Sequence, residues 1–139
     1  WSPDGKLLVF DSDLDVKELV SSSINLYVMG ADGSDPRRIF SSAESPSWSP
    51  DGRTIACTSR RAGLYWQIYL LNPDGSGVRQ LTSGGYDARY PAWSPDGKWI
   101  AFAGNQEGHW ELYVIPAAGG QPVRLTFGSS DSSYPAWGP

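Results

Sequence analysis

The apolar residues of this chain gather in short runs that recur along its length. One kind of run opens with a charged residue and is then mostly apolar; the three examples are 6–10, 53–57 and 98–102. A strand that is buried on both faces has this short, almost continuous apolar pattern. We therefore predict buried strands at three equivalent places in the chain.

Two further runs follow each of these strands after a polar loop. The first contains a tyrosine at a fixed place and covers residues 24–29, 67–71 and 111–115. The second alternates polar and apolar residues and covers residues 37–40, 78–82 and 122–126. Glycine-rich segments join the two runs, which is typical of hairpins, and the alternation suits a strand with one solvated face.

The sequence WSPDG comes before each cluster of runs and sets the period. It occurs at Trp1, Trp48 and Trp93, and a remnant, WGP, begins at Trp137, so the spacings are 47, 45 and 44 residues. A fixed period of this size indicates a repeat architecture. Within SPDG the serine, proline and glycine stand at the first, second and fourth positions, which predicts a type I turn whose glycine has a positive φ.

The residues immediately before each repeated tryptophan predict a fourth strand. A proline stands two residues before each of these tryptophans, at Pro46, Pro91 and Pro135, and this suits an edge strand or the start of a strand. Four antiparallel strands in about 45 residues describe one blade of a β-propeller. We predict an all-β chain that forms a single unit of three blades. The repeats cover residues 1–47, 48–92 and 93–139.

The third repeat carries a resemblance to a known family. It reads WSPDGKWIAF, then ELYVIPAAGGQPVRLT, and then SSDSSYPAW. This succession resembles the TolB-like β-propeller repeat, a WD-like repeat that also occurs in the propellers of prolyl-oligopeptidase-type and tricorn-type proteases. The resemblance implies a propeller that presents loops and a channel mouth to protein or peptide partners, in the periplasm or outside the cell. It does not imply one activity, because many activities share this scaffold.

Composition and charge argue against several classes of function. The chain has 139 residues and a net charge of −4, and its only basic clusters are the arginine pairs 37–38 and 60–61. Non-specific nucleic-acid binding depends on clustered positive charge, so no nucleic-acid partner is expected. No apolar run approaches the roughly 18 residues of a membrane helix, so no membrane span is expected either.

The chain offers little of the chemistry that an enzyme needs. Its one histidine, His109, lies in a polar loop, and there is no GxSxG motif for a nucleophile. One histidine cannot supply a metal-binding cluster, and one cysteine excludes an intrachain disulfide. Cys57 takes the place that Phe10 and Phe102 have in the other repeats, so we expect a buried thiol. We predict no catalytic residue, no metal and no cofactor.

One acidic segment, 11–15, has aspartates at alternate positions, as a calcium-binding loop has at its start. Val16 stands where such a loop needs glycine, and Ser22 stands where it needs glutamate. We therefore expect a solvated acidic loop. The segment belongs to an insertion of about five residues that lengthens the first repeat.

The segments that enter the fourth strand supply the candidate binding residues. In a propeller this strand starts beside the central channel, so Glu44, Asp87, Arg89 and Asp131 are candidates for the channel mouth. Polar groups gathered there suit a cation, waters or an inserted peptide. An aspartate can also cap the turn before its strand through its own backbone. The sequence leaves both interpretations open.

Aromatic residues mark the loop before the run that contains the tyrosine. Trp66 and Trp110 occupy the same position, three residues before that tyrosine, and Tyr65 and His109 precede them. These four residues are candidates for an aromatic rim that contacts a partner. The alternative is structural, because a residue that recurs in register usually packs between blades.

Three blades are too few for a closed ring, since propellers typically have about four to eight. Two chains would together supply six. We therefore predict a homodimer of two half-rings, in which the last segment, 133–137, completes the first blade of the partner by pairing with residues 6–10. We interpret the chain as a non-catalytic interaction scaffold cut from a longer propeller protein. The alternative is part of the gating propeller of a serine peptidase.

Overall fold

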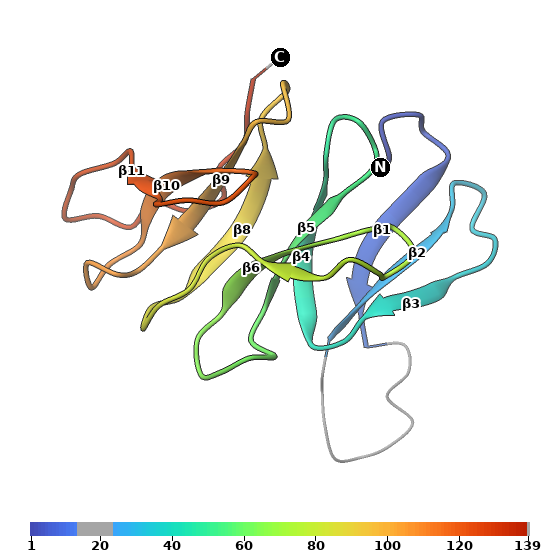
Figure 1. Cartoon of the computed structure of the whole chain (residues 1–139), viewed down its shortest axis with the longest axis horizontal. Coiled ribbons are helices and arrows are strands. Elements are labelled where there is room, and N and C mark those ends of the chain that lie inside the picture. Colours follow the sequence, from blue (N-terminus) through green and yellow to red (C-terminus); the bar gives the residue numbers. More distant parts are fainter. Residues whose placement is uncertain (14–23, 139) are drawn as a thin grey trace.

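The computed structural model describes residues 1–13 and 24–138, and this part of the chain contains strands but no helix (Figure 1). Three antiparallel sheets follow one another along the chain. The first consists of β1 (Leu7–Ser12), β2 (Asn25–Gly30) and β3 (Arg37–Phe40). The second consists of β4 (Ala43–Trp48), β5 (Ile55–Ser59), β6 (Gln67–Leu71) and β7 (Arg79–Gln80). The third consists of β8 (Ala88–Trp93), β9 (Trp99–Gly104), β10 (Glu111–Pro116) and β11 (Val123–Arg124). No helix in the described residues is long and apolar enough to cross a membrane.

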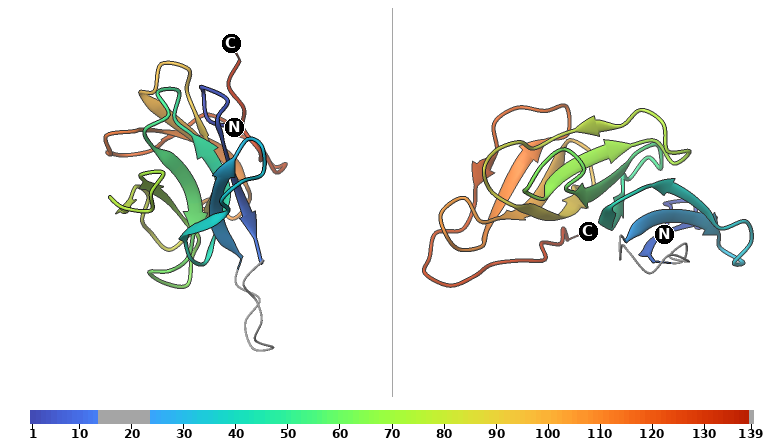
Figure 2. Two further views of the ribbon diagram at one scale, coloured as in Figure 1. Left: turned by 90° about the vertical axis from the view of Figure 1, so that its right-hand side faces the viewer. Right: turned by 90° about the horizontal axis from the view of Figure 1, so that it is seen from below.

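Each sheet has the strand order of a propeller blade. The second and third sheets pair in chain order, β4-β5-β6-β7 and β8-β9-β10-β11, and the first pairs as β1-β2-β3. Figures 1 and 2 show three separate sheets side by side, and β4 contacts both β1 and β8 of its neighbours. The all-β propeller prediction is confirmed. Residues 133–137, expected to form a strand with a second copy, form no strand in the single chain.

The repeated turn is built as the sequence predicts. In the second repeat Gly52 has a φ of 70°, and its N–H donates to the carbonyl of Ser49 at 3.0 Å. The Ser49 hydroxyl donates to Asp51 at 2.6 Å and accepts the N–H of Thr54 at 2.9 Å. The same bonds recur in the other two repeats. The hydrogen bond from Ser49 holds the pKa of Asp51 below its ordinary value, so each turn is closed around a charged carboxylate.

The prolines of the fourth strand lie inside it, and not at its start. β4 and β8 are edge strands, as predicted, and they contain Pro46 and Pro91. Each proline follows a residue with a left-handed backbone, Ser45 at φ 54° and Tyr90 at φ 58°, at a point where the strand register shifts. Proline fits such a bulge because the ladder is already interrupted there.

The apolar core lies between the blades. One cluster joins the first two blades and includes Leu26, Val28, Ile55 and Leu71. An equivalent cluster joins the second and third blades and includes Ile68, Leu70, Ile100 and Ile115. β5 and β6 have a blade on either side and are buried throughout, whereas β1 has a blade on one side only and is partly exposed. The prediction of burial on both faces therefore holds for the inner blade and fails for β1.

Cys57 is buried, as predicted. Its side chain is 0% exposed and lies opposite Tyr69 on the neighbouring strand. In the first blade Phe10 takes this place and stacks on Tyr27, with ring centres 5.6 Å apart. Beside the smaller Cys57, the ring of Phe40 from the preceding blade packs near Tyr69, with the two ring centres 6.0 Å apart. Burial raises the pKa of the Cys57 thiol, which suppresses the reactive thiolate.

Candidate functional site

Three of the four channel candidates meet at the junction of the second and third blades. Arg89 on β8 places one guanidinium nitrogen 3.4 Å from a carboxylate oxygen of Glu44 on β4. Its other terminal nitrogen lies 3.7 Å from a carboxylate oxygen of Asp87. All three side chains are mostly buried, with 20–23% of each exposed. The cluster therefore joins two neighbouring blades through one arginine.

Two of the rim candidates also belong to this cluster. The Arg89 guanidinium carbon lies 4.6 Å from the ring centre of Trp66 and 5.9 Å from that of Trp110. Both distances are within the range of a cation–π interaction. Arg89 Nε is buried and has no hydrogen-bond partner among the described residues. We call Glu44, Asp87, Arg89, Trp66 and Trp110 the arginine–tryptophan cluster.

Asp87 and Asp131 each cap the loop that leads into the second or third tyrosine-containing strand, and not the turn before their own strand. Asp87 accepts the backbone N–H of Trp66 at 2.8 Å, and Asp131 accepts the backbone N–H of Trp110 at 2.9 Å. Each bond ties the segment leaving one blade to a loop of that same blade. Asp131 is exposed and lies outside the arginine–tryptophan cluster. Whether the two carboxylates line a closed channel stays a prediction.

The other two rim candidates have different surroundings. Tyr65 is 44% exposed and lines a pocket with Tyr69 and Gln80. His109 is turned toward Glu111, with its Nε2 2.8 Å from a carboxylate oxygen. The described residues contain no group of His, Cys, Asp and Glu side chains that could hold a metal ion.

Glu111 is a buried charged residue that the sequence analysis missed. Its side chain is 0% exposed. The carboxylate accepts the hydroxyl of Thr126, a guanidinium N–H of Arg124 at 2.8 Å and the N–H of Gly128 at 3.0 Å. These bonds, with that of Thr126 the largest cause, lower the pKa of Glu111 to about 2. Because its carboxylate binds Thr126 and Gly128, Glu111 holds the loop after β11 against β10.

A signal for this buried network was present in the repeats. The residue at the start of the second strand is polar in all three blades: Asn25, Gln67 and Glu111. Gln67 accepts the hydroxyl of Thr82 at 2.7 Å and donates to the carbonyl of Tyr86 at 2.7 Å. A polar residue at this place thus fixes the exit loop of its blade.

The acidic segment of the first repeat lies partly outside the described residues, which exclude Asp15, Val16 and Ser22. Asp11 belongs to β1 and accepts the N–H of Ser45 in the next blade at 3.2 Å. This carboxylate therefore takes part in packing between blades.

Comparison with known proteins connects these features to a family. Residues 40–139 match the model of the family described as TolB beta propeller domain. The Tol-Pal system protein TolB of Syntrophus aciditrophicus is 39% identical over 73 residues, which are 49% of this chain and 16% of that protein. The uncharacterized peptidase YuxL of Bacillus subtilis is 33% identical over 85 residues, which are 59% of this chain and 13% of that protein.

The fold has a close counterpart among solved structures. A structure from Agrobacterium tumefaciens assigned as TolB superposes with a TM-score of 0.86 at 25% identity, and the match covers 96% of this chain and 47% of that chain. The chain thus spans a small part of the curated relatives and about half of this structure. With the family model matching most of its length and the same blades in its structure, this chain belongs to the TolB β-propeller domain family.

Proposed function

We propose that this chain is a non-catalytic propeller scaffold that binds a protein or peptide at the mouth of its channel. The observation that carries the proposal is the arginine–tryptophan cluster, in which residues of two blades and two loops converge on Arg89. Aromatic residues and arginine are enriched in protein interfaces, where they carry much of the binding energy.

The geometry of the cluster suits a preformed binding site. The backbone of each tryptophan is fixed by an aspartate that accepts its N–H. Arg89 is held between two carboxylates and two indole rings, so little side-chain freedom is left to lose when a partner binds. Such preorganisation lowers the entropic cost of binding. The cluster also presents both charges and aromatic surface, which matches the mixed chemistry of a peptide.

Replacing Arg89 by glutamine is expected to weaken peptide binding. Peptides selected on the wild-type protein from a random phage-displayed library should bind the variant at least about tenfold more weakly, the size of one charge-assisted hydrogen bond. Arg53→Gln is the matched control, because Arg53 is an exposed arginine in the turn before β5 and lies outside the arginine–tryptophan cluster. Circular dichroism checks that both variants are folded. Selection of no peptide, or of peptides that bind the Arg89 variant equally well, contradicts the proposal.

We further propose that two copies of this chain close a six-bladed ring. The match to about half of the solved structure from Agrobacterium tumefaciens supports the idea of a half-ring. The residue four places before each repeated tryptophan is Glu44, Arg89 or Ser133. In a two-fold ring these three would follow one another twice around the channel, so that acidic, basic and hydroxyl side chains alternate.

Light scattering tests this ring directly. The purified chain should have about twice its monomer mass of 15.1 kDa. A folded monomer at micromolar concentration contradicts the ring, and a trimer indicates nine blades instead of six.

A second candidate function is part of the gating propeller of a serine peptidase of the prolyl-oligopeptidase type. The sequence identity to the peptidase YuxL favours it. In this case the catalytic residues would lie on a separate hydrolase domain of the parent protein. A hydrolase domain with a GxSxG motif in the same gene supports this function, and a parent gene without a nucleophile domain excludes it.

A further inference from the structure

Each blade has a leading face, which packs on the next blade along the chain. Equivalent residues form it in the three blades: Leu26, Val28 and Ile39; Ile68, Leu70 and Leu81; Leu112, Val114 and Leu125. In the first blade Ile39 is only 8% exposed, because the second blade covers it. Leu125 at the same place in the third blade is 52% exposed. The leading face of the third blade therefore has apolar residues and no blade on it.

The first blade has the opposite unpaired surface, which we call its trailing face. It consists of Leu8, Phe10 and Met29, all partly exposed. The equivalent residues of the second blade are Ile55, Cys57 and Leu71, which are 0%, 0% and 1% exposed. The leading face of the third blade and the trailing face of the first therefore have the same kinds of residue as the leading and trailing faces that pack together within the chain.

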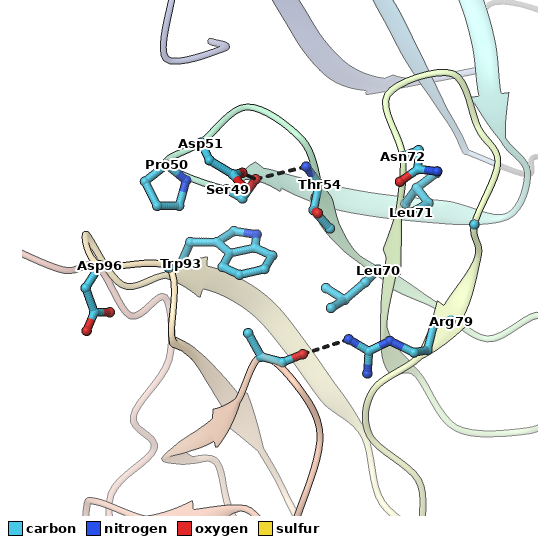
Figure 3. A pocket seen from close by; sticks show the side chains of 13 residues that line it. Ser49, Pro50, Asp51, Thr54, Leu70, Leu71, Asn72, Arg79, Trp93 and Asp96 are labelled. Carbon is cyan, nitrogen blue, oxygen red and sulfur yellow. Dashed lines mark hydrogen bonds between the residues drawn. The ribbon is translucent and has the colours of Figure 1, made fainter.

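Each of the two blade contacts within the chain contains an arginine that bridges the blades. Arg37 on β3 donates to the carbonyl of Pro73 in the second blade at 3.2 Å. Arg79 on β7 donates to the carbonyl of Ala117 in the third blade at 2.7 Å, beside a cleft of about 410 Å³ that Trp93 lines (Figure 3). We call this bond the arginine clamp.

The third blade cannot make this clamp. By the strand register, Val123 on β11 occupies the place of Arg37 and Arg79. The carbonyl of Ala31 in the first blade takes the place of the acceptors Pro73 and Ala117 in their blades. Val123 is 55% exposed, and its side chain has no donor.

The repeated turns mark the same register. A Cβ added at Gly52 would lie 3.4 Å from Pro3, and one added at Gly97 would lie 3.3 Å from Pro50, so each turn packs on the proline of the preceding one. Gly5 has no atom within 4 Å of such a Cβ. The turn of the third repeat offers Pro95 in the position that Pro3 and Pro50 have.

We propose that the leading face of the third blade docks on the trailing face of the first blade of a second copy, in the register of the two contacts within the chain. This inference rests on the ring proposed above. Pro95 then packs against Gly5 of the second copy, and Val123 lies over its Ala31 carbonyl. Because the clamp is missing, this contact is held by apolar burial and strand pairing alone. It is therefore the contact that an added clamp should tighten.

Val123→Arg tests the register by supplying the missing clamp. Two new clamps per dimer should lower the dimer dissociation constant by about tenfold. Val123→Gln is the matched control, since it is polar but carries no guanidinium and should not tighten the dimer. Analytical ultracentrifugation over a dilution series measures all three proteins. A dimer that is unchanged or weaker with arginine overturns the proposed register.

Leu125→Asp tests the docking face itself. A carboxylate at the centre of the apolar contact should raise the dissociation constant by at least about a hundredfold. Val78→Asp is the control, because Val78 is 40% exposed just before β7 of the second blade, away from the docking face. A wild-type monomer overturns the ring proposal. A wild-type dimer that survives Leu125→Asp overturns only the docking face proposed here.

Discussion

Replacing Glu111 by glutamine is expected to lower the thermal midpoint of unfolding by more than about 5 °C at neutral pH. The wild-type carboxylate accepts hydrogen bonds from Thr126, Arg124 and Gly128 in a fully buried position. Glutamine keeps one acceptor oxygen but turns an NH2 group toward these donors. At least one donor then loses its partner, and the positive charge of Arg124 loses its buried counter-ion.

The effect of this change should depend on pH in a defined direction. The hydrogen bonds hold the pKa of Glu111 at about 2 in the folded protein, against an ordinary value of 4.5. A group whose pKa is lowered on folding adds stability that is fully present above the unfolded pKa and is lost as the pH falls. The difference between wild type and Glu111→Gln should therefore shrink between pH 4.5 and about 2.

Thermal unfolding followed by circular dichroism across this pH range measures both effects. Glu107→Gln is the matched control, because Glu107 also lies 3.9 Å from Arg124 but is 50% exposed. An exposed pair of this kind contributes about 0–1 kcal/mol, so this variant should unfold close to the wild type. Equal midpoints for wild type and Glu111→Gln would show that the buried carboxylate is not a structural anchor.

The blades could be predicted from the sequence because their signals are local and occur three times. The turn of Ser49, Asp51 and Gly52 depends on residues within one short segment, and its hydrogen bonds repeat in each copy. The burial of Cys57 followed from comparing one position with its equivalents, Phe10 and Phe102. A repeat thus provides its own internal alignment, which a single globular domain lacks.

The features that were missed depend on contacts between distant segments. The bulges at Pro46 and Pro91 place the N–H of the residue before the proline against the preceding blade, as in the bond from Tyr90 to Thr58 at 3.3 Å. Glu111 finds Thr126 across a hairpin, and no residue close to it in the sequence indicates that partner. The pattern within a repeat specifies a blade, whereas these contacts depend on how that blade meets the next segment.

The candidate site was predicted in part for the same reason. Glu44, Asp87 and Arg89 lie together in the structure because they enter successive strands at one edge. Their place at a channel mouth stays a prediction. His109 was placed with the tryptophans by its position in the loop, but its Nε2 lies 2.8 Å from the buried carboxylate of Glu111. Asp131 lies in the segment that follows the third blade. Its surroundings in a ring depend on the blade that follows.

Deleting residues 133–139 is expected to convert the dimer to a monomer. In the single chain residues 133–137 already pack along β8: the ring centres of Tyr134 and Tyr90 are 4.1 Å apart, and the Trp137 indole N–H donates to the carbonyl of Ala92 at 3.0 Å. These contacts place the segment where the innermost strand of a following blade would lie. In the proposed ring, its free backbone edge pairs with β1 of the second copy, which has an unpaired edge of its own.

The deletion removes backbone pairing at both ends of the dimer at once, because each chain supplies one such segment. The dissociation constant of the dimer should therefore rise by more than about a thousandfold, a larger change than any single side chain at the interface should cause. Tyr134→Ala in the full-length chain is the matched control. It removes the ring contact with Tyr90 and keeps the backbone, so the dimer should weaken without being lost.

Sedimentation velocity and circular dichroism together separate dissociation from unfolding. The deleted segment contributes no strand to the three sheets of its own chain, so the shortened protein should keep its β-sheet spectrum while its mass falls to that of one chain. A shortened protein that remains a dimer would falsify the exchange of this strand. Loss of the β-sheet spectrum would show instead that the segment is needed within its own chain, through its contacts with Tyr90 and Ala92.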